Sequence, residues 1–181
     1  MATIEQITAI LKNLSAASLG EILALAEALR KKETRASAWS FDFVENFSDS
    51  TRSGMEIKVA GATCAGVTRA ALWEHPPMTG VASVGYLVPI RTGLKQIKLN
   101  FAIGIRDGAE LPADRYVAFR VLVNGWKLWS TVKNSHDWEE HEIKMPQLSS
   151  DVARIEFITD ALGDNRWNWA VWGEPCLEGD T

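Results

Sequence analysis

The sequence predicts a mainly β protein, an antiparallel two-layer β-sandwich preceded by an α-helical hairpin. Apolar residues follow helical spacing up to about residue 33 and alternate with period two from about residue 37. Turn signals rich in Gly, Pro, Asn and Asp then separate roughly eight or nine short alternating segments. With 181 residues and 46% hydrophobic content, the chain can bury a continuous core without metal or disulfide staples. We therefore expect a hairpin over residues 1–35 and a sandwich over residues 36–181.

The hairpin is predicted from two amphipathic stretches. Thr3 can cap a first helix, and Ser18 with Glu21 has the capping-box pattern of a second helix. The apolar positions of the first helix are Ile4, Ile7, Ile10, Leu11 and Leu14. Fewer than about 40 residues rarely form a core alone, so the hairpin must dock on the sandwich or pair with another subunit. The stretch also loosely resembles the small dimerisation hairpins of bacterial antitoxins and a ribosomal stalk protein. We expect a homo-oligomer through residues 3–32.

The strands are predicted from alternation along the rest of the chain. The clearest case is the segment 97–105, in which every second residue is a large apolar one. Similar alternation marks the segments 39–44, 55–59, 81–88, 117–123, 139–145, 154–159 and 167–172. Short strands joined by short turns favour an antiparallel two-layer sandwich.

Charge and hydropathy exclude several classes of partner. The formal net charge is −4, and basic residues are scattered, which argues against duplex nucleic acid. No apolar run approaches the roughly 20 residues that cross a membrane, and the N-terminus lacks the features of a secretory signal. We expect no membrane partner and a cytoplasmic location, with export by a non-classical route left open.

The sequence shows no catalytic motif. Nucleophile elbows, phosphate-binding glycine loops and metal-binding histidine pairs are missing, and His136 and His141 stand five residues apart. Cys64 and Cys176 have no metal spacing and are interpreted as core hydrophobes, with a disulfide between them as the alternative. The prediction is therefore that the chain is not an enzyme.

Four segments, taken in order, resemble the galactose-binding-like jelly rolls, and most closely the novel carbohydrate-binding modules that accompany glycosidases. They are residues 71–77, 101–108, 117–125 and 167–175. The resemblance spans residues 37–178 and implies a jelly-roll sandwich and a glycan ligand. The chain departs from it at Asn168, where such modules often carry an acidic residue.

The same resemblance implies a structural calcium ion in some members. Hard oxygen ligands stand near Asp107, Asp164 and Glu174, which leaves such an ion open. Because no dense acidic loop is present, no cofactor is expected.

Strand parity predicts where a ligand could bind. If consecutive strands are antiparallel, alternate connections meet at one end of the sandwich, and one end collects residues 75–80, 106–115, 131–137 and 162–168. A saccharide needs aromatic faces and planar polar groups, and this end supplies both. The predicted stacking residues are Trp138 and Trp167, and the predicted polar residues are His75, Arg106, Asp107, Asp164 and Asn165.

Each of these residues also has a plain structural explanation. Asp107, Asp164 and Asn165 are common turn residues, and His75 could bond a buried carbonyl. Trp169 alternates with the core set and is expected to be buried. Two functions follow: a lectin-like module made multivalent by its hairpin, or a cytoplasmic protein interaction or assembly module that binds no sugar.

Overall fold

The computed structural model describes residues 39–148 and 150–180, together with residues 8, 11–15, 18, 19, 22, 23 and 26. The chain divides into two compact units, Met1–Ala38 and Trp39–Thr181.

The predicted helical hairpin falls mostly outside the described residues. Where this unit is described, the backbone at Thr8, Leu11 and several later positions is helical. The amide of Ser18 donates to Ser15 Oγ (3.2 Å) and the amide of Leu19 to the Ser15 carbonyl (2.9 Å), so the capping residue is Ser15 and not Ser18. The packing of two helices and a dimer face through residues 3–32 stay predictions. No helix in the described part is long and apolar enough to span a membrane.

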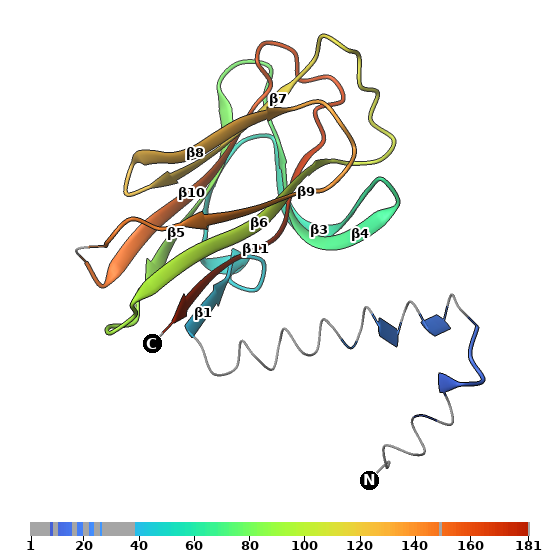
Figure 1. The fold of residues 1–181 in the computed structure, drawn as a ribbon. Coiled ribbons are helices and arrows are strands. Elements are labelled where there is room, and N and C mark those ends of the chain that lie inside the picture. Colours follow the sequence, from blue (N-terminus) through green and yellow to red (C-terminus); the bar gives the residue numbers. More distant parts are fainter. Residues whose placement is uncertain are drawn as a thin grey trace. The chain divides into compact units, whose positions relative to one another are not determined.

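The second unit is an antiparallel two-layer β-sandwich (Figure 1). One sheet contains β3 (Glu56–Cys64), β4 (Val67–His75), β11 (Ala170–Asp180), β6 (Gln96–Ile105) and β9 (Glu139–Lys144), with β1 (Trp39–Asp42) paired to β11. The other contains β2 (Thr51–Ser53), β5 (Val81–Pro89), β10 (Val152–Asp160), β7 (Val117–Val123) and β8 (Trp126–Lys133). A 3₁₀ turn, η1 (Phe47–Asp49), links β1 to β2. The predicted mainly β sandwich is confirmed.

The strand pattern differs from the prediction in three additional strands and in the start of the last strand. Strands β2, β4 and β8 were not predicted, since their polar and apolar residues do not alternate cleanly. The last strand begins at Ala170, not at residue 167, and its register shifts between Gly173 and Cys176. Trp167 and Trp169 therefore precede the strand, and Trp167 has a positive φ of 67°.

Aromatic rings fill the core between the two sheets. Trp172 is fully buried. Its ring meets Phe157 edge to face at 5.0 Å, and Phe157 meets Phe43 at 4.9 Å. Burying each such ring stabilises the fold by about 1.5–3 kcal/mol. Cys64 and Cys176 are buried thiols, as the core interpretation predicts, and burial raises the pKa of Cys64 to about 12.

One carboxyl group lies inside this apolar core. Glu74 on β4 is 0% exposed, and its Oε2 accepts a hydrogen bond from Trp172 Nε1 at 2.6 Å. Its Oε1 has no hydrogen-bond partner among the described residues. Burial raises the pKa of Glu74 well above the usual carboxyl range, more than the Trp172 hydrogen bond lowers it.

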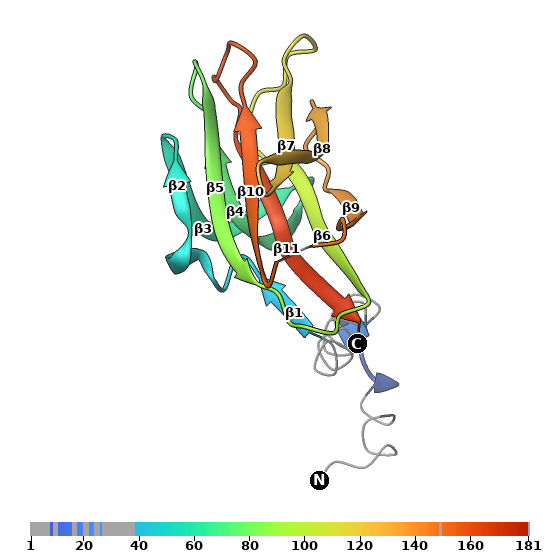
Figure 2. The same ribbon diagram turned by 90° about the vertical axis from the view of Figure 1, so that its left-hand side faces the viewer.

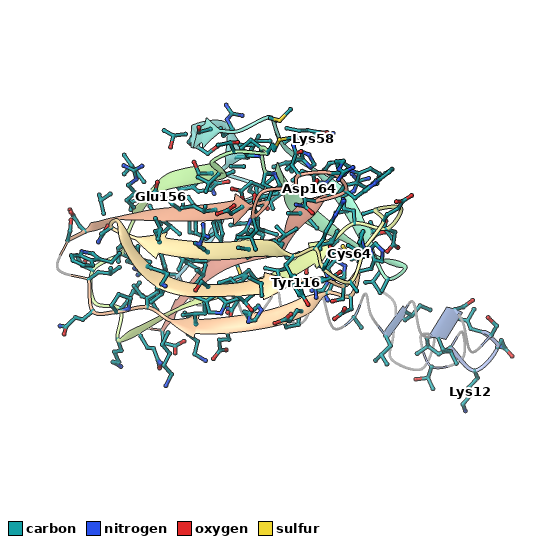
Figure 3. The ribbon with its side chains drawn as sticks, turned by 90° about the horizontal axis from the view of Figure 1, so that it is seen from above. Lys12, Lys58, Cys64, Tyr116, Glu156 and Asp164 are labelled. Carbon is teal, nitrogen blue, oxygen red and sulfur yellow. The ribbon has the colours of Figure 1, made fainter. Side chains whose placement is uncertain are left out.

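The loops sort to two ends of the sandwich. Figure 2 shows the β4–β5, β6–β7 and β10–β11 connections together at one end, as strand parity predicts. The β5–β6 and β9–β10 connections lie at the other end. In Figure 3 the strands run across the view, and Asp164 is labelled toward this end, away from Glu156.

Candidate functional site

A row of alternating cationic and aromatic side chains stands at the first of these ends, on the outer face of the β3–β4–β11–β6 sheet. The Lys58 Nζ atom lies 4.1 Å from the ring centroid of Trp73. The guanidinium carbon of Arg106 lies 3.4 Å from the Trp73 centroid and 5.3 Å from that of Trp169. Trp169 in turn lies 5.4 Å from Trp167, at an interplanar angle of 56°. We call these five residues the cation–aromatic row.

Strand register brings the row together. Lys58 on β3 pairs with Trp73 on β4, and Trp73 pairs with Val171 on β11. Arg106 directly follows β6 and Trp169 directly precedes β11, and the Arg106 amide donates to the Trp169 carbonyl at 3.1 Å. Lys58 therefore approaches Trp73 from the β3 side, and Arg106 approaches it from the β11 and β6 side. Each separate contact is a cation–π interaction of about 0.5–2 kcal/mol.

A small cavity of about 160 Å³ opens between these residues. It is lined by Glu56, Trp73, His75, Arg106, Trp169 and Ala170. The cavity therefore has room for several waters or for a small polar group. Glu56 accepts a hydrogen bond from Lys58 at 2.5 Å, which lowers the pKa of the Glu56 carboxyl.

Arg106 is held by rings and not by carboxylates. Within the described residues its guanidinium has no ion pair and no side-chain hydrogen bond. Burial lowers the pKa of Arg106, and the nearby Glu56 carboxylate opposes that shift. Ring stacking covers the faces of a guanidinium, while its five N–H donors point outward in its plane. The structure therefore holds an oriented set of hydrogen-bond donors at the cavity.

Three predicted site residues belong to this surface directly. His75 and Arg106 line the cavity, and Trp167 ends the row with 37% of its surface exposed. Asn165 lies beside it, with its Nδ2 atom 3.9 Å from the sulfur of Met55, the residue before β3.

The other three predicted residues, Asp107, Asp164 and Trp138, contact neighbouring turns, arginines and strands of the sandwich. The Asp107 carboxylate accepts from the amides of Gly66 (2.9 Å) and Ala65 (2.7 Å), which fixes the β3–β4 turn and lowers the pKa of Asp107. Asp164 is bound by Arg166 at 2.7 Å and Arg115 at 3.0 Å, and the Arg166 hydrogen bonds hold its pKa far below the usual range.

Trp138 packs flat against the sheet. Its Nε1 donates to the Val67 carbonyl at 2.9 Å. A Cβ added at Gly173 would lie 2.8 Å from its ring, and one at Gly104 would lie 3.1 Å from it. This face of the indole is therefore covered, and Arg69 lies over the ring at 5.3 Å from its centroid.

Sequence reasoning missed Trp73, Trp169, Lys58 and Glu56. Trp169 was expected in the core, but it is half-buried and lines the cavity, since β11 begins at Ala170, three residues after the predicted start. Trp73 lies on β4, which was not predicted as a strand. A sequence signal for part of this set is present. Glu56 and Lys58 alternate on one strand, and they pair with the aromatic residues His75 and Trp73, which alternate on the next strand.

The oxygen ligands considered for calcium do not converge. Asp107 and Asp164 bind the groups named above, and Glu174 lies 3.9 Å from Arg69. Across the described residues, no three His, Cys, Asp or Glu side chains are grouped so that they could hold a metal ion.

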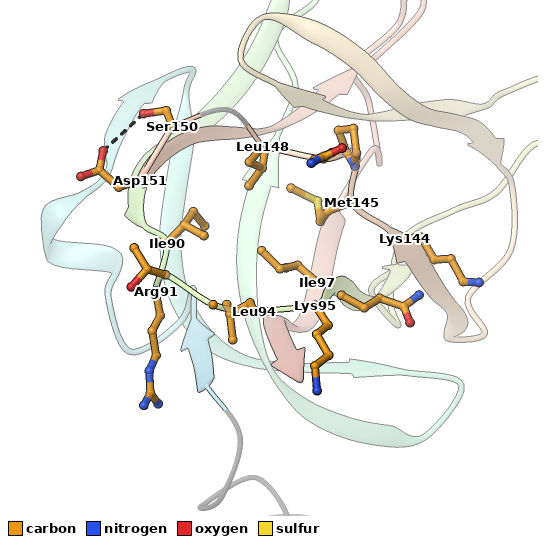
Figure 4. A pocket seen from close by; sticks show the side chains of 15 residues that line it. Ile90, Arg91, Leu94, Lys95, Ile97, Lys144, Met145, Leu148, Ser150 and Asp151 are labelled. Atoms are coloured by element: carbon orange, nitrogen blue, oxygen red, sulfur yellow. Dashed lines mark hydrogen bonds between the residues drawn. The ribbon is translucent and has the colours of Figure 1, made fainter. Parts of the chain in front are cut away.

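A larger groove of about 700 Å³ lies at the opposite end (Figure 4). It is formed by the β5–β6 and β9–β10 connections, with Ile90, Leu94, Ile97, Met145 and Leu148 as its apolar lining. Arg91, Lys95 and Lys144 stand around it. No aromatic residue is among the described residues that line it.

No protein-family model and no curated protein matches the sequence. Solved structures match its fold at low identity. A CBM51 module of a Clostridium perfringens GH95 enzyme, in complex with methyl-galactose, is 10% identical with a TM-score of 0.54 over 77% of this chain and 99% of its own. Tandem CBM51 modules of a Streptococcus pneumoniae family 98 glycoside hydrolase are 16% identical, with a TM-score of 0.51 over 80% of this chain and 42% of theirs.

TmCBM61, in complex with β-1,4-galactotriose, is 15% identical with a TM-score of 0.51 over 77% of this chain and 94% of its own. At such identities the likeness is one of fold. The chain has the β-sandwich fold of these carbohydrate-binding modules, in agreement with the galactose-binding-like sandwich that four sequence segments predicted.

Proposed function

We propose that the chain is a non-catalytic saccharide-binding module whose site is the cation–aromatic row. The observation that carries the proposal is Arg106 held between Trp73 and Trp169 beside a small polar cavity. The fold supports it, because the solved neighbours are carbohydrate-binding modules, two of them in complex with galactose-containing ligands. Fold alone does not fix a function, because function depends on the residues of the site.

The row supplies what a sugar ring needs. Lys58 and Arg106 both lie over Trp73, at 4.1 Å and 3.4 Å from its ring centroid, so this indole supports the two cations and is not the ring assigned to stack on a ligand. Trp167 is exposed and adjoins Trp169, and these two rings offer an aromatic surface for the apolar face of a pyranose. His75, Glu56 and the Arg106 donors stand close enough to the same cavity to bond hydroxyl groups.

The site lacks the means for glycoside hydrolysis. That reaction uses two carboxyl groups on either side of the scissile bond, about 5–9.5 Å apart. Glu56 is the one carboxylate among the described residues that line the cavity, and it is paired with Lys58. Binding without catalysis is what this arrangement can perform.

The test is a glycan array probed with the full-length chain. Retention of saccharides by the native protein, lost in Trp167→Ala and kept in Trp126→Ala, would support the proposal. Trp126 is the matched control because it is 82% exposed and lies in the β7–β8 hairpin of the other sheet. If no saccharide is retained at high protein concentration, the proposal fails.

Self-association through residues 3–32 would place several weak binding sites in one assembly. Linked sites can raise apparent affinity by about 10²–10⁴ without any new contact. Light scattering on the full-length chain tests it: a mass above the 20.0 kDa of one chain supports assembly, and a monomer at all concentrations rejects it.

A second candidate function is protein docking through the other sheet. It is favoured by Leu87 on β5, which is 72% exposed, and by Trp126. Large exposed apolar side chains are enriched at protein interfaces. In that case Leu87→Ser and Trp126→Ser would weaken capture of the protein partner, whereas Trp167→Ala would leave it unchanged.

A further inference from the structure

The charge of Arg106 is not balanced by a carboxylate, in contrast to most arginines of the sandwich. Five others each lie within ion-pair distance of a carboxylate: Arg69, Arg115, Arg120, Arg154 and Arg166. Arg106 is partly buried, and burial of an unpaired charge costs free energy unless a partner binds it. A cation kept in this state, with its donors directed outward, is suited to an anionic partner.

The carboxylates nearest to Arg106 are engaged by other groups. Glu56 shares the cavity, but its carboxylate is engaged by Lys58 at 2.5 Å. The neighbouring Asp107 is turned to the amides of Ala65 and Gly66, and it also lies 3.9 Å from His136. The cavity therefore keeps one uncompensated positive charge.

The side-chain donors of Arg106 have no acceptor among the described residues. The Trp73 Nε1 atom also lacks one, but it is buried and therefore adds no accessible donor to the cavity. Lys58 already gives one of its hydrogens to Glu56. A ligand group that only accepts hydrogen bonds complements the Arg106 donors better than a hydroxyl, which must also donate.

We infer that the site selects acidic saccharides, with Arg106 binding the carboxylate of a uronic or similar sugar acid. This inference rests on the proposed function and names its ligand class. The planar guanidinium matches a carboxylate with two parallel hydrogen bonds, and such charge-assisted pairs are about twice as strong as neutral ones. The rest of the sugar would lie toward Trp169 and Trp167, which follow Arg106 in the row.

The experiment compares matched ligands on the full-length chain. Uronic acid oligosaccharides of several backbones are titrated by calorimetry beside the same oligosaccharides after chemical reduction of each carboxyl to a primary alcohol. The acidic form should bind about tenfold more tightly. Raising the salt concentration should weaken binding of the acid and leave that of the reduced twin nearly unchanged.

Variants of Arg106 complete the test. Arg106→Gln should remove the preference for the acid, and Arg106→Lys should keep the salt dependence but lose part of the affinity, because a single ammonium cannot form the paired hydrogen bonds. A thermal melt checks that each variant is folded. If Arg106→Gln unfolds, the inference is tested on the wild-type protein alone, by comparing its affinities for the acidic and the reduced oligosaccharide at low and high salt.

The outcomes are distinct. Equal binding of the acid and its reduced twin overturns the inference while the proposed function stands. A sulfate-ester oligosaccharide bound more tightly than the uronate overturns the carboxylate assignment. If neither the acid nor the neutral twin binds, and the glycan array is blank, the proposed function and this inference fall together.

Discussion

Two of the hollows among the described residues lie at opposite ends of β6, and they differ in size and in the side chains that line them. The groove beside Gln96 and Ile97 is about 700 Å³ and is lined by aliphatic and flexible cationic side chains. The cavity beside Arg106 is about 160 Å³ and is bounded by two indoles. Volume alone would select the groove. Aromatic faces and oriented polar groups select the cavity, because these determine whether a sugar can be bound at all.

The two hollows also differ in how their residues are held. Connecting loops form most of the groove, so its long side chains lose rotamer freedom when a ligand binds. Most of the cavity residues stand on strands or directly beside a strand end, at Glu56, Trp73, His75 and Arg106. Their positions are fixed by the sheet register before any ligand arrives, which lowers the cost of binding.

The largest expected effect that separates the two ends comes from Trp169→Ala. This substitution removes the ring that lies between Arg106 and Trp167. Contact between an aromatic ring and the apolar face of a sugar contributes a major part of the affinity of a small saccharide site. We expect a loss of at least about tenfold in saccharide affinity, equal to ~1.4 kcal/mol. Isothermal titration measures it, with Trp126→Ala as the control. Unchanged affinity would place the site elsewhere.

A second prediction concerns stability of the scaffold under the site. Gly173→Ala places a Cβ 2.8 Å from the Trp138 ring and should reduce the free energy of unfolding by about 1–3 kcal/mol. Gly61→Ala on the same sheet is the matched control, because the nearest atom to its new Cβ, Thr68 Cγ2, is 3.6 Å away. Urea denaturation of the two variants compares them. Equal stabilities would mean that Trp138 does not cover the sheet as described.

Glu74 gives a pH-dependent prediction. Its pKa is raised in the folded state, so the folded chain binds more protons than the unfolded chain between the ordinary carboxyl pKa, about 4.3, and the raised value. The contribution of this group to stability is therefore complete below that range and is lost as the pH rises through it. Glu74→Gln should flatten this loss and, at neutral pH, raise the free energy of unfolding by on the order of 1 kcal/mol.

Chemical denaturation at a series of pH values measures the effect. Trp172 Nε1 can donate to the amide oxygen of the glutamine as it does to the carboxylate. A variant that is less stable than the native chain at neutral pH, with unaltered pH dependence, would contradict the account of Glu74.

The smallest effect is expected at the groove. Arg91→Ala with Lys144→Ala removes two of its cations at the end opposite the row. Saccharide affinity should change by less than about twofold, since no charge within the Debye length of ~8 Å of the cavity is altered. A loss comparable with that of Trp169→Ala would reverse the comparison of the two hollows.

The sequence allowed the layers of the fold to be predicted, because alternation along β6, β7 and β10 reports directly which residues face the core. It also located His75, Arg106 and Trp167 at one end through strand parity. Trp73 was not predicted as a site residue, because the first half of β4 consists largely of polar and small residues and the segment was not recognised as a strand.

Turn residues were the other point that sequence patterns left undecided. Asp164 lies in a Gly-Asp-Asn turn that sequence patterns cannot distinguish from a ligand loop, and only three-dimensional contacts show that Arg115 and Arg166 occupy its carboxylate. The start of β11 at Ala170 was equally hidden, because Trp167 and Trp169 continue the aromatic pattern of the strand although they precede it.

The most direct test of the central claim is an NMR titration of the tryptophan indole N–H signals. The sequence has eight tryptophans, each assignable by single substitution, and they sample the row, the core and the far hairpin. On addition of a saccharide retained on the array, we predict that the signals of Trp167, Trp169 and Trp73 shift, while those of Trp126 and Trp172 stay in place. Shifts confined to Trp126, or saturation without any change at Trp167 and Trp169, would contradict the claim that this row binds saccharide.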